Sequence, residues 1–320
     1  MVDFDDIPKT LMTTLEFSYA PIAIFAYNRP DHLKRTVDAL LLNREAENSN
    51  LYIFSDGPKN DSDRSMIEKT RQYASTIKGF KSLTLVNRSQ NLGLAKAIIT
   101  GVTEICEKEG QVIVLEDDLV TAPYFLDFMN SSLRLYKDDE KVASIHGYML
   151  PVKKRLPDTF FFRGADCLGW ATWKRAWDLF ELDGKALLGK IQSAKLSKTF
   201  DLDGAYPYCQ MLADQIAGKN NSWAIRWHAS MFIRNMLTLN CSRSLVQHIG
   251  NDGSGTNFGV SDLLDTPLAS YPIKLENIPI AESMEGRRAI AHYYAAYKFF
   301  PRRVMRKALN IYRHYNSIFH

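Results

Sequence analysis

The chain has 320 residues, 46% hydrophobic and 24% charged, with a formal net charge of +4. This length allows one large α/β domain or two small ones, and the composition is typical of a globular protein. No run of about 18 apolar residues occurs, so no membrane-spanning helix is predicted. The first 16 residues lack the order of a signal peptide. The four cysteines form no Cys-x-x-Cys pair, which disfavours a zinc site and favours a cytoplasmic protein.

Charge is distributed unevenly along the chain. Residues 286–320 hold eight basic and no acidic residues, against 32 basic and 36 acidic residues in the rest. The basic residues are Arg287, Arg288, Lys298, Arg302, Arg303, Arg306, Lys307 and Arg313. Tyr and Phe side chains lie between them, and this pattern predicts a basic aromatic helical tail that contacts an anionic membrane surface through residues 287–315. A helix docked on the acidic body is the alternative; no motif supports nucleic acid as a partner.

Strands and helices alternate in the first half of the chain. Apolar runs predict buried strands at 21–26, 51–54, 82–86, 112–115 and 142–145. Amphipathic segments predict helices at 30–41, 61–77, 94–105 and 125–136. This alternation predicts an α/β fold with a doubly wound, mostly parallel sheet flanked by helices.

Polar residues follow each predicted strand, and Glu116, Asp117 and Asp118 follow the most apolar one. Ligands of open α/β sheets bind beyond the carboxyl ends of such strands. Three adjacent carboxylates repel one another unless a cation or hydrogen-bond donors lie among them. The segment therefore predicts a site for a hard divalent metal, Mn²⁺ or Mg²⁺. A solvated acidic turn before a helix is the alternative.

The second half contains an aromatic turn and a long loop. Leu168-Gly169-Trp170 forms the turn, in which Trp170 is predicted to offer its flat face to a sugar ring. Residues 241–260 are rich in Gly and Asn and are predicted to be a lid, closing over a diphosphate through Asn251, Ser254 and Thr256. A Gly-x-Gly-x-x-Gly segment after the first strand and a Gly-Lys-Ser/Thr loop are both absent, which disfavours a dinucleotide site and a P-loop.

Together these motifs resemble those of nucleotide-sugar-dependent glycosyltransferases of the GT-A fold. The resemblance rests on Pro21 to Asp31, Ser55-Asp56-Gly57, Gln90 to Ala97, Glu116 to Leu119, and Leu168-Gly169-Trp170. It is closest to family 2 transferases and to N-acetylglucosaminyltransferases with a Glu-Asp-Asp motif. It implies one catalytic domain over residues 1–285, with a nucleotide-sugar half at about 20–150 and an acceptor half at 151–270, followed by the tail at 286–320.

The resemblance also implies a UDP-sugar donor and roles for individual residues. Asp118 would bind the metal directly and Asp117 through water, while Glu116 would face the ribose and Asp56 the uracil. The remaining donor-site residues are Arg29, Asn87, Asn91 and His248. For Arg29 a structural capping role, and for His248 a structural hydrogen bond, are the alternatives.

Inverting transfer requires a general base that takes the proton of the acceptor hydroxyl. Asp214 is the first candidate, because the resembled family has an Asp and an Arg at the separation of Asp214 and Arg226; a solvated helical acid is the alternative. Asp166 is the second candidate. The expected acceptor is a saccharide or a lipid-linked molecule in bacterial surface polysaccharide or glycoconjugate assembly. The expected location is the cytoplasm, either free or at the inner face of the cytoplasmic membrane. The alternative functions are a sugar nucleotidyltransferase and a non-catalytic GT-A scaffold that binds sugar or a partner protein.

Overall fold

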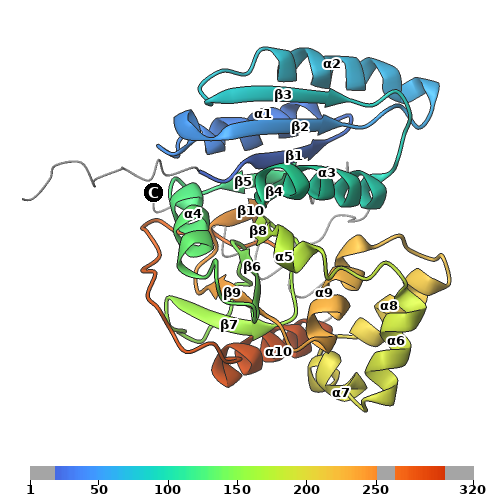
Figure 1. The fold of residues 1–320 in the computed structure, drawn as a ribbon, viewed down its shortest axis with the longest axis vertical. Coiled ribbons are helices and arrows are strands. Elements are labelled where there is room, and N and C mark those ends of the chain that lie inside the picture. The colour runs from blue at the N-terminus through green and yellow to red at the C-terminus, as the bar shows by residue number, and fades with distance from the viewer. Residues whose placement is uncertain (1–18, 251–263, 300–320) are drawn as a thin grey trace, which may run out of the picture.

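The computed structural model describes residues 19–250 and 264–299. A large mixed sheet runs through the molecule, with helices packed on both faces (Figure 1). The strands are β1 (Ile22–Ala26), β2 (Asn50–Ser55), β3 (Ser82–Asn87), β4 (Gln111–Glu116), β5 (Leu119–Thr121), β6 (Val142–His146), β7 (Thr159–Arg163), β8 (Trp170–Trp173), β9 (Leu237–Cys241) and β10 (Val246–His248). The α-helices are α1 (Pro30–Leu40), α2 (Arg64–Ser75), α3 (Leu94–Glu109), α4 (Phe125–Leu135), α5 (Lys174–Trp177), α6 (Gly184–Ser193), α7 (Ser197–Phe200), α8 (Tyr208–Ile216), α9 (Trp223–Ile233) and α10 (Met284–Phe299). Single 3₁₀ turns are η1 (Ala46–Asn48), η2 (Asp61–Asp63) and η3 (Leu202–Gly204).

The main sheet has the strand order β3-β2-β1-β4-β8-β6-β9-β7. β1 pairs in parallel with β2 and β4, and β2 in parallel with β3, as the alternation of strands and helices predicts. β8 is antiparallel to both of its neighbours, β4 and β6, so that β4 and β6 run in the same direction. β9 continues this direction beside β6, and β7 closes the edge antiparallel to it. The predicted α/β fold with a mostly parallel sheet is confirmed.

Both faces of the sheet are buried, which explains why its central strands are continuous apolar runs. Along β1, Ile22 and Ile24 pack into the cluster that also contains the inward faces of α1 and α4. Ala23 and Phe25 point the other way, into a cluster shared with α3, α5 and α9. Gly101 of α3 lies against Phe25: a Cβ at this position would be 2.7 Å from the Phe25 ring. α3 can therefore approach β1 this closely because Gly101 has no side chain.

The helix α10 packs on the body of the protein instead of projecting from it. Ala289 and Ile290 belong to the main hydrophobic core. Arg287, predicted to contact a membrane, is only 5% exposed. It donates hydrogen bonds to the carbonyl of Thr199 at 2.7 Å and to Asp203 at 3.3 Å. For Arg287 the membrane prediction was therefore wrong, because its charge is paired inside the fold. The division at residue 286 falls inside α10.

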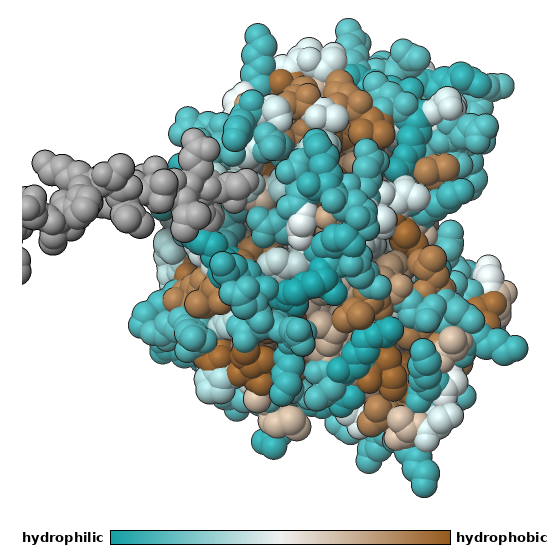
Figure 2. Space-filling view, viewed as in Figure 1, coloured by the Kyte–Doolittle hydropathy of each residue, from teal (hydrophilic) through white to brown (hydrophobic). Residues whose placement is uncertain are grey.

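Several predicted features lie outside the described residues. These are Asn251, Ser254 and Thr256 of the predicted lid and, in the tail, Arg302, Arg303, Arg306, Lys307 and Arg313. Among the described helices none is long and apolar enough to cross a membrane. On the face shown in Figure 2, hydrophilic side chains cover most of the surface, and hydrophobic ones lie in separate groups.

The paired burial of Arg287 makes a prediction for stability. Replacing Arg287 with Met should lower the free energy of unfolding by about 2 kcal/mol, because Glu282 and the Thr199 carbonyl lose their donor. The neighbouring Arg288 is exposed, so Arg288→Met is the matched control and should change stability by less than about 0.5 kcal/mol. Urea denaturation followed by circular dichroism measures both; equal stabilities of the two variants would contradict the docking of α10.

Candidate active site

The candidate site lies where β1 and β4 end at the same edge of the sheet. Arg29 follows β1 and precedes α1, whose Pro30 suits the first helical position. Asp117 and Asp118 follow Glu116, the last residue of β4. The small sheet formed by β5 and β10 brings in a distant segment, because His248 pairs with Leu119. The sequence-predicted residues Arg29, Asp117, Asp118 and His248 are thus brought together.

Arg29 is the counter-charge of two buried carboxylates. Its guanidinium forms ion pairs with Asp117 and, at 2.8 Å, with Asp118. The side chains of Asp117 and Asp118 are 3% and 8% exposed. Arg29 forms no side-chain capping hydrogen bond to α1, so the ion pairs, and not helix capping, account for its position. A charge pair this deeply buried needs such close contacts to offset the loss of hydration.

Asp117 is further fixed by the backbone around it. Its amide donates to the Phe25 carbonyl at 3.0 Å, and the Thr36 hydroxyl donates to the Asp117 carbonyl at 2.8 Å. The Tyr27 amide contacts its carboxylate at 3.4 Å. Asp117 therefore ties the end of β4 to β1 and α1.

Asp118 is the more available of the two carboxylates. His248 Nε2 lies 3.5 Å from Asp118 Oδ2. The other oxygen, Oδ1, is buried and has no hydrogen-bond partner among the described residues. Gly250 packs directly on this carboxylate, since a Cβ at Gly250 would collide with Asp118 Oδ2. A buried carboxylate oxygen without a partner is costly and indicates a ligand position.

The surroundings shift the pKa values of the three acids in different directions. Burial raises the pKa of the Glu116 carboxyl to about 8, and the charges of Asp118 and Asp117 add to the rise. Burial also raises the pKa of Asp117, although Arg29 opposes it. Burial also favours a higher pKa for Asp118, but the contacts with His248 and Arg29 have the larger effect, and the pKa of Asp118 is lowered. Asp118 is thus the acid most firmly held as a carboxylate, the form that a metal ion requires.

The donor set can be tested for its fit to a divalent metal. No group of three or more His, Cys, Asp or Glu side chains arranged to hold a metal ion occurs in the described parts of the chain. Asp118 and His248 offer one carboxylate oxygen and one imidazole. Mg²⁺ and similar ions are commonly held by one or two protein ligands, with waters and substrate phosphates completing the shell. The pair therefore fits a cation that is shared with a phosphate-bearing substrate.

Asp56 has a structural role that its motif did not predict. Its carboxylate accepts hydrogen bonds from the amides of Leu92, at 3.0 Å, and Gly93, at 2.9 Å, as well as from Gly57. Asn91 donates back to the Gly57 carbonyl at 2.8 Å. These contacts lock the turn after β2 onto the segment before α3. A carboxylate has about four acceptor positions, so the predicted contact with a base would use the remaining one.

Asn87 and Arg71 complete this end of the site. Asn87 is the exposed last residue of β3, beside Ser55 of β2. Arg71 was not predicted; it donates to the carbonyls of Asp56, at 3.2 Å, and Arg88, at 2.7 Å. Arg71 thus holds the ends of β2 and β3 together.

Of the predicted acceptor turn Leu168-Gly169-Trp170, Leu168 lines a cavity, but the Trp170 side chain points into the core. Trp170 is 1% exposed and packs among Trp177, Trp223 and Trp227, with ring centroids 5.4–5.9 Å apart. The prediction that it forms a wall for a sugar was wrong, because its ring fills the core between the sheet and α9. Gly169, with φ +63°, turns the chain against Val246. Leu168 lines a cavity together with His146 of β6 and Asn240 of β9.

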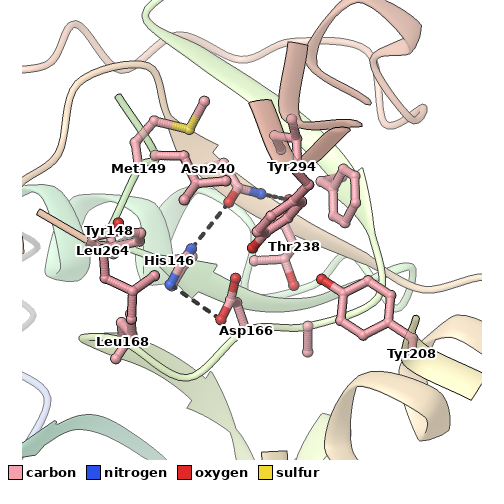
Figure 3. A pocket seen from close by; sticks show the side chains of 14 residues that line it. His146, Tyr148, Met149, Asp166, Leu168, Tyr208, Thr238, Asn240, Leu264 and Tyr294 are labelled. Atoms are coloured by element: carbon pink, nitrogen blue, oxygen red, sulfur yellow. Dashed lines mark hydrogen bonds and ion pairs between the residues drawn. The ribbon is translucent and has the colours of Figure 1, made fainter. Parts of the chain in front are cut away.

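This cavity lies beyond the ends of β6 and β9 and has about 70 Å³ in which the centre of a water molecule can lie. His146, the last residue of β6, lies between Asn240 and Asp166 (Figure 3). His146 Nδ1 is 3.2 Å from Asn240 Oδ1, and His146 Nε2 is 3.8 Å from Asp166 Oδ1. The Asp166 side chain is 52% exposed. Asp166 therefore offers an accessible carboxylate at the cavity.

His228 of α9 fixes the turn that carries Asp166. Its Nδ1 lies 2.8 Å from the Ala165 carbonyl, and Thr238 donates to the Gly164 carbonyl at 2.7 Å. The buried ring also stacks on Tyr208, with centroids 4.6 Å apart.

Asp214, the first candidate for the base, lies on α8, away from these contacts. Its carboxylate accepts from Gln210 at 3.0 Å and from Lys219 at 3.2 Å. Arg226, the partner inferred from its separation in the sequence, instead donates to the carbonyls of Ser222 and Leu182. No contact between Asp214 and a cavity residue is seen in the described parts of the chain.

Sequence reasoning missed His146, Tyr148, Asn240 and Tyr294, which also line the cavity. For His146 a signal was present, because it directly follows the predicted strand 142–145 and polar residues at such ends mark sites. For Asn240 and Tyr294 the sequence contains no such signal. They lie on β9 and α10, which reach the cavity through contacts between segments that are distant in the chain.

The sequence model of glycosyl transferase family 2 matches residues 22–146. This region, about two fifths of the chain, is therefore similar to that family. It covers β1 to β6 and includes Arg29, Asp56, Glu116, Asp117 and Asp118, and the resemblance inferred from the motifs is confirmed. This similarity supports a role in glycosyl transfer. No curated protein matches the chain.

Solved structures are similar at low sequence identity. TarS of S. aureus is 11% identical over 48% of this chain, with a TM-score of 0.30; the chain covers 28% of TarS. The mannosyltransferase PcManGT from Pyrobaculum calidifontis, in complex with GDP-Man and Mn²⁺, is 12% identical, with a TM-score of 0.35. That match covers 68% of this chain and 70% of PcManGT.

The burial of His228 predicts a pH dependence of stability. Burial lowers the pKa of His228, so below about pH 6.5 the unfolded chain binds a proton that the folded chain does not. The contribution of His228 to the free energy of unfolding should therefore fall as the pH falls from 7 to 5.5, by up to about 1.4 kcal/mol per pH unit, whereas Glu116, whose pKa is raised, contributes with the opposite sign. Urea denaturation at each pH measures it. His228→Gln should remove the His228 contribution and change the slope of the profile by that amount, whereas replacement of the exposed His292 by Gln should leave the slope as in the wild type. Equal slopes for His228→Gln and wild type would refute the assignment.

Proposed function

We propose that this protein transfers a sugar from a nucleotide-sugar donor, a UDP-sugar by its motifs, to a saccharide or lipid-linked acceptor. The observation that carries the proposal is Asp118, a buried carboxylate with one oxygen unpaired among the described residues, between Arg29 and His248. It lies at the carboxyl edge of the sheet within the region that matches family 2. The family match supports the transfer reaction, and the side chains around Asp118 support a diphosphate at this edge.

Loss of a nucleoside diphosphate puts negative charge on the departing phosphate, and the site residues can meet that charge. A divalent cation at Asp118 and His248 would supply Lewis-acid stabilisation to the diphosphate. Arg29 brings a fixed positive charge to the same place, already oriented by Asp117 and Asp118. Such pre-oriented charges stabilise a developing anion without rearranging at the moment of reaction. Glu116 would face the ribose, and Asp56, Asn87 and Asn91 would lie toward the base.

For the general base we propose Asp166, in preference to Asp214. The Asp166 carboxylate is accessible at the cavity and lies 3.8 Å from His146 Nε2. It would take the proton of the acceptor hydroxyl as that oxygen bonds to the sugar C1, while the bond from C1 to the diphosphate oxygen breaks and its electron pair leaves with the diphosphate. Attack opposite the leaving group inverts the anomeric centre. The pairing of Asp214 with Lys219 supports a surface role for that residue.

Replacement of Asp118 by Asn tests the donor site. We expect release of nucleoside diphosphate from UDP-, GDP- or dTDP-sugars with Mn²⁺ to fall by about 100-fold or more, because the carboxylate that would hold the cation is gone. The Mn²⁺-dependent rise in melting temperature with the nucleotide should also be lost. Asp127→Asn, at an exposed acid on α4, is the control and should keep both. An active Asp118→Asn protein would contradict the site, and release of pyrophosphate by the wild type from a nucleoside triphosphate and a sugar 1-phosphate would indicate a nucleotidyltransferase.

Replacement of each candidate base separates Asp166 from Asp214. Asp166→Asn should lower transfer to an acceptor by about 100-fold or more, the usual range for a missing general base. Asp214→Asn should keep transfer within a few-fold of the wild type. Product formation is measured by mass spectrometry after the donor is chosen from the panel above. A large loss of transfer in Asp214→Asn with little loss in Asp166→Asn would instead identify Asp214 as the base.

A further inference from the structure

The cavity beside Asp166 contains buried polar atoms that nothing in the described structure satisfies. His146 is 2% exposed and Tyr148 3%. His146 Nε2 and the Tyr148 hydroxyl have no hydrogen-bond partner among the described residues. Both residues line the cavity. Buried polar groups are nearly always paired with protein, water or a ligand, so two unpaired groups in one cavity indicate a hydrogen-bonding occupant.

The hydrogen bonds of His146 define what kind of occupant fits. Asn240 Oδ1 can only accept, so His146 Nδ1 at 3.2 Å carries the proton. The orientation of Asn240 is supported by the bond from its Nδ2 to the Thr238 carbonyl at 3.0 Å. In the neutral ring Nε2 is then an acceptor, and it faces the carboxylate of Asp166, which is also an acceptor. Because His146 Nε2 and the Asp166 carboxylate are both acceptors, an occupant between them must have hydroxyl groups that donate hydrogen bonds.

The remaining walls of the cavity are aromatic and aliphatic. Tyr208 and Tyr294 contribute rings, and Leu168 and Ile290 contribute aliphatic side chains. Asp166 is the one acidic residue of the lining, and Lys and Arg are absent from it in the described structure. A negatively charged ligand would find no counter-charge there and would be repelled by Asp166. A sugar ring without acidic groups has the required combination of hydroxyls and apolar C–H faces.

The size and position of the cavity suit one sugar unit next to the donor. A volume of about 70 Å³ for water centres holds about five waters, the scale of a single ring. Glu116 and His146 are the last residues of β4 and β6, which run in the same direction on either side of β8. Neighbouring strands lie about 4.8 Å apart, and His146 is level with Val114, two residues before Glu116, so these two strand ends are about 12 Å apart.

We propose that this cavity binds the reacting unit of the acceptor, and that this unit is a neutral, hydroxyl-bearing sugar. His146 and Tyr148 determine specificity by hydrogen bonding to its hydroxyls, and Asp166 faces the hydroxyl that reacts. The α10 residues Ile290 and Tyr294 form part of the wall, so the C-terminal helix belongs to the acceptor site. The inference rests on the proposed glycosyl transfer, of which it names the acceptor class.

The test measures glycoside binding at His146 without a donor. The ring signal of His146 is followed by carbon–proton NMR and identified by its loss in His146→Asn. Methyl β-glucopyranoside, methyl α-mannopyranoside and methyl β-N-acetylglucosaminide are titrated, with methyl glucuronoside and glycerol 3-phosphate as anionic probes. We expect at least one neutral glycoside to shift the signal and the anionic probes to leave it in place at the same concentration. Tyr148→Phe should weaken the binding about fivefold by removing one hydroxyl, whereas Tyr271→Phe, at a 55% exposed position, should not change it.

Three results would overturn the inference: anionic probes that bind as well as neutral ones, no shift with any neutral glycoside, or unchanged binding in Tyr148→Phe. A separate assay distinguishes failure of this inference from failure of the proposed function. Hydrolysis of the nucleotide-sugar in the absence of acceptor is measured in the wild type, and the acceptor KM should rise about fivefold in Tyr148→Phe and stay unchanged in the control Tyr271→Phe. Failure of the wild type to release nucleoside diphosphate from any donor would reject the proposed function, whereas normal release with an unchanged acceptor KM would reject only the acceptor assignment.

Discussion

The burial of two adjacent carboxylates at the sheet edge is the constraint on which the site depends. Asp117 and Asp118 are 2% and 5% exposed, and without a counter-charge their desolvation would cost several kcal/mol each. Arg29 supplies that charge because β1 is the neighbour of β4 and α1 starts immediately after β1. His248 reaches Asp118 because β10 pairs with β5. Three separate segments of the chain must therefore be placed correctly before the acidic cluster can be held, and any loss of that placement would raise the energy of the folded state directly.

A single antiparallel strand links the two halves of the candidate site. Through β8, Trp170 pairs with Val114 of β4 on one side and with His146 of β6 on the other. Its ring is held by Trp177, Trp223 and Trp227, and a ring packed this tightly has few ways to move. The separation between the acidic edge and the cavity is thus set by a rigid part of the core. Trp170 serves the two sites by fixing their spacing and not by touching a ligand.

The parallel half of the fold could be predicted from the sequence because its information is local. Each of its strands is an apolar run followed by turn residues and an amphipathic helix, and the acidic cluster follows directly from the strand that carries it. β8, β9 and β10 could not be predicted in this way, because their pairings join segments that are far apart in the chain. The same limit applies to the site. The motif around Asp56 identifies an acid at a strand end, but only the fold shows that the Leu92 and Gly93 amides already occupy it.

The C-terminal helix shows how composition and burial can point in different directions. Its excess of basic residues predicted a surface partner, yet α10 has one inward face, with Arg287, Ala289 and Ile290 buried, and one outward face, with Arg288 and His292 exposed. A count of charges does not report which face each residue is on, whereas the helical spacing of the apolar residues does. The inward face reaches the cavity through Ile290 and Tyr294. Because the same helix is anchored by Arg287 and lines the cavity one turn later, the docking of α10 and the shape of the cavity are not independent of each other.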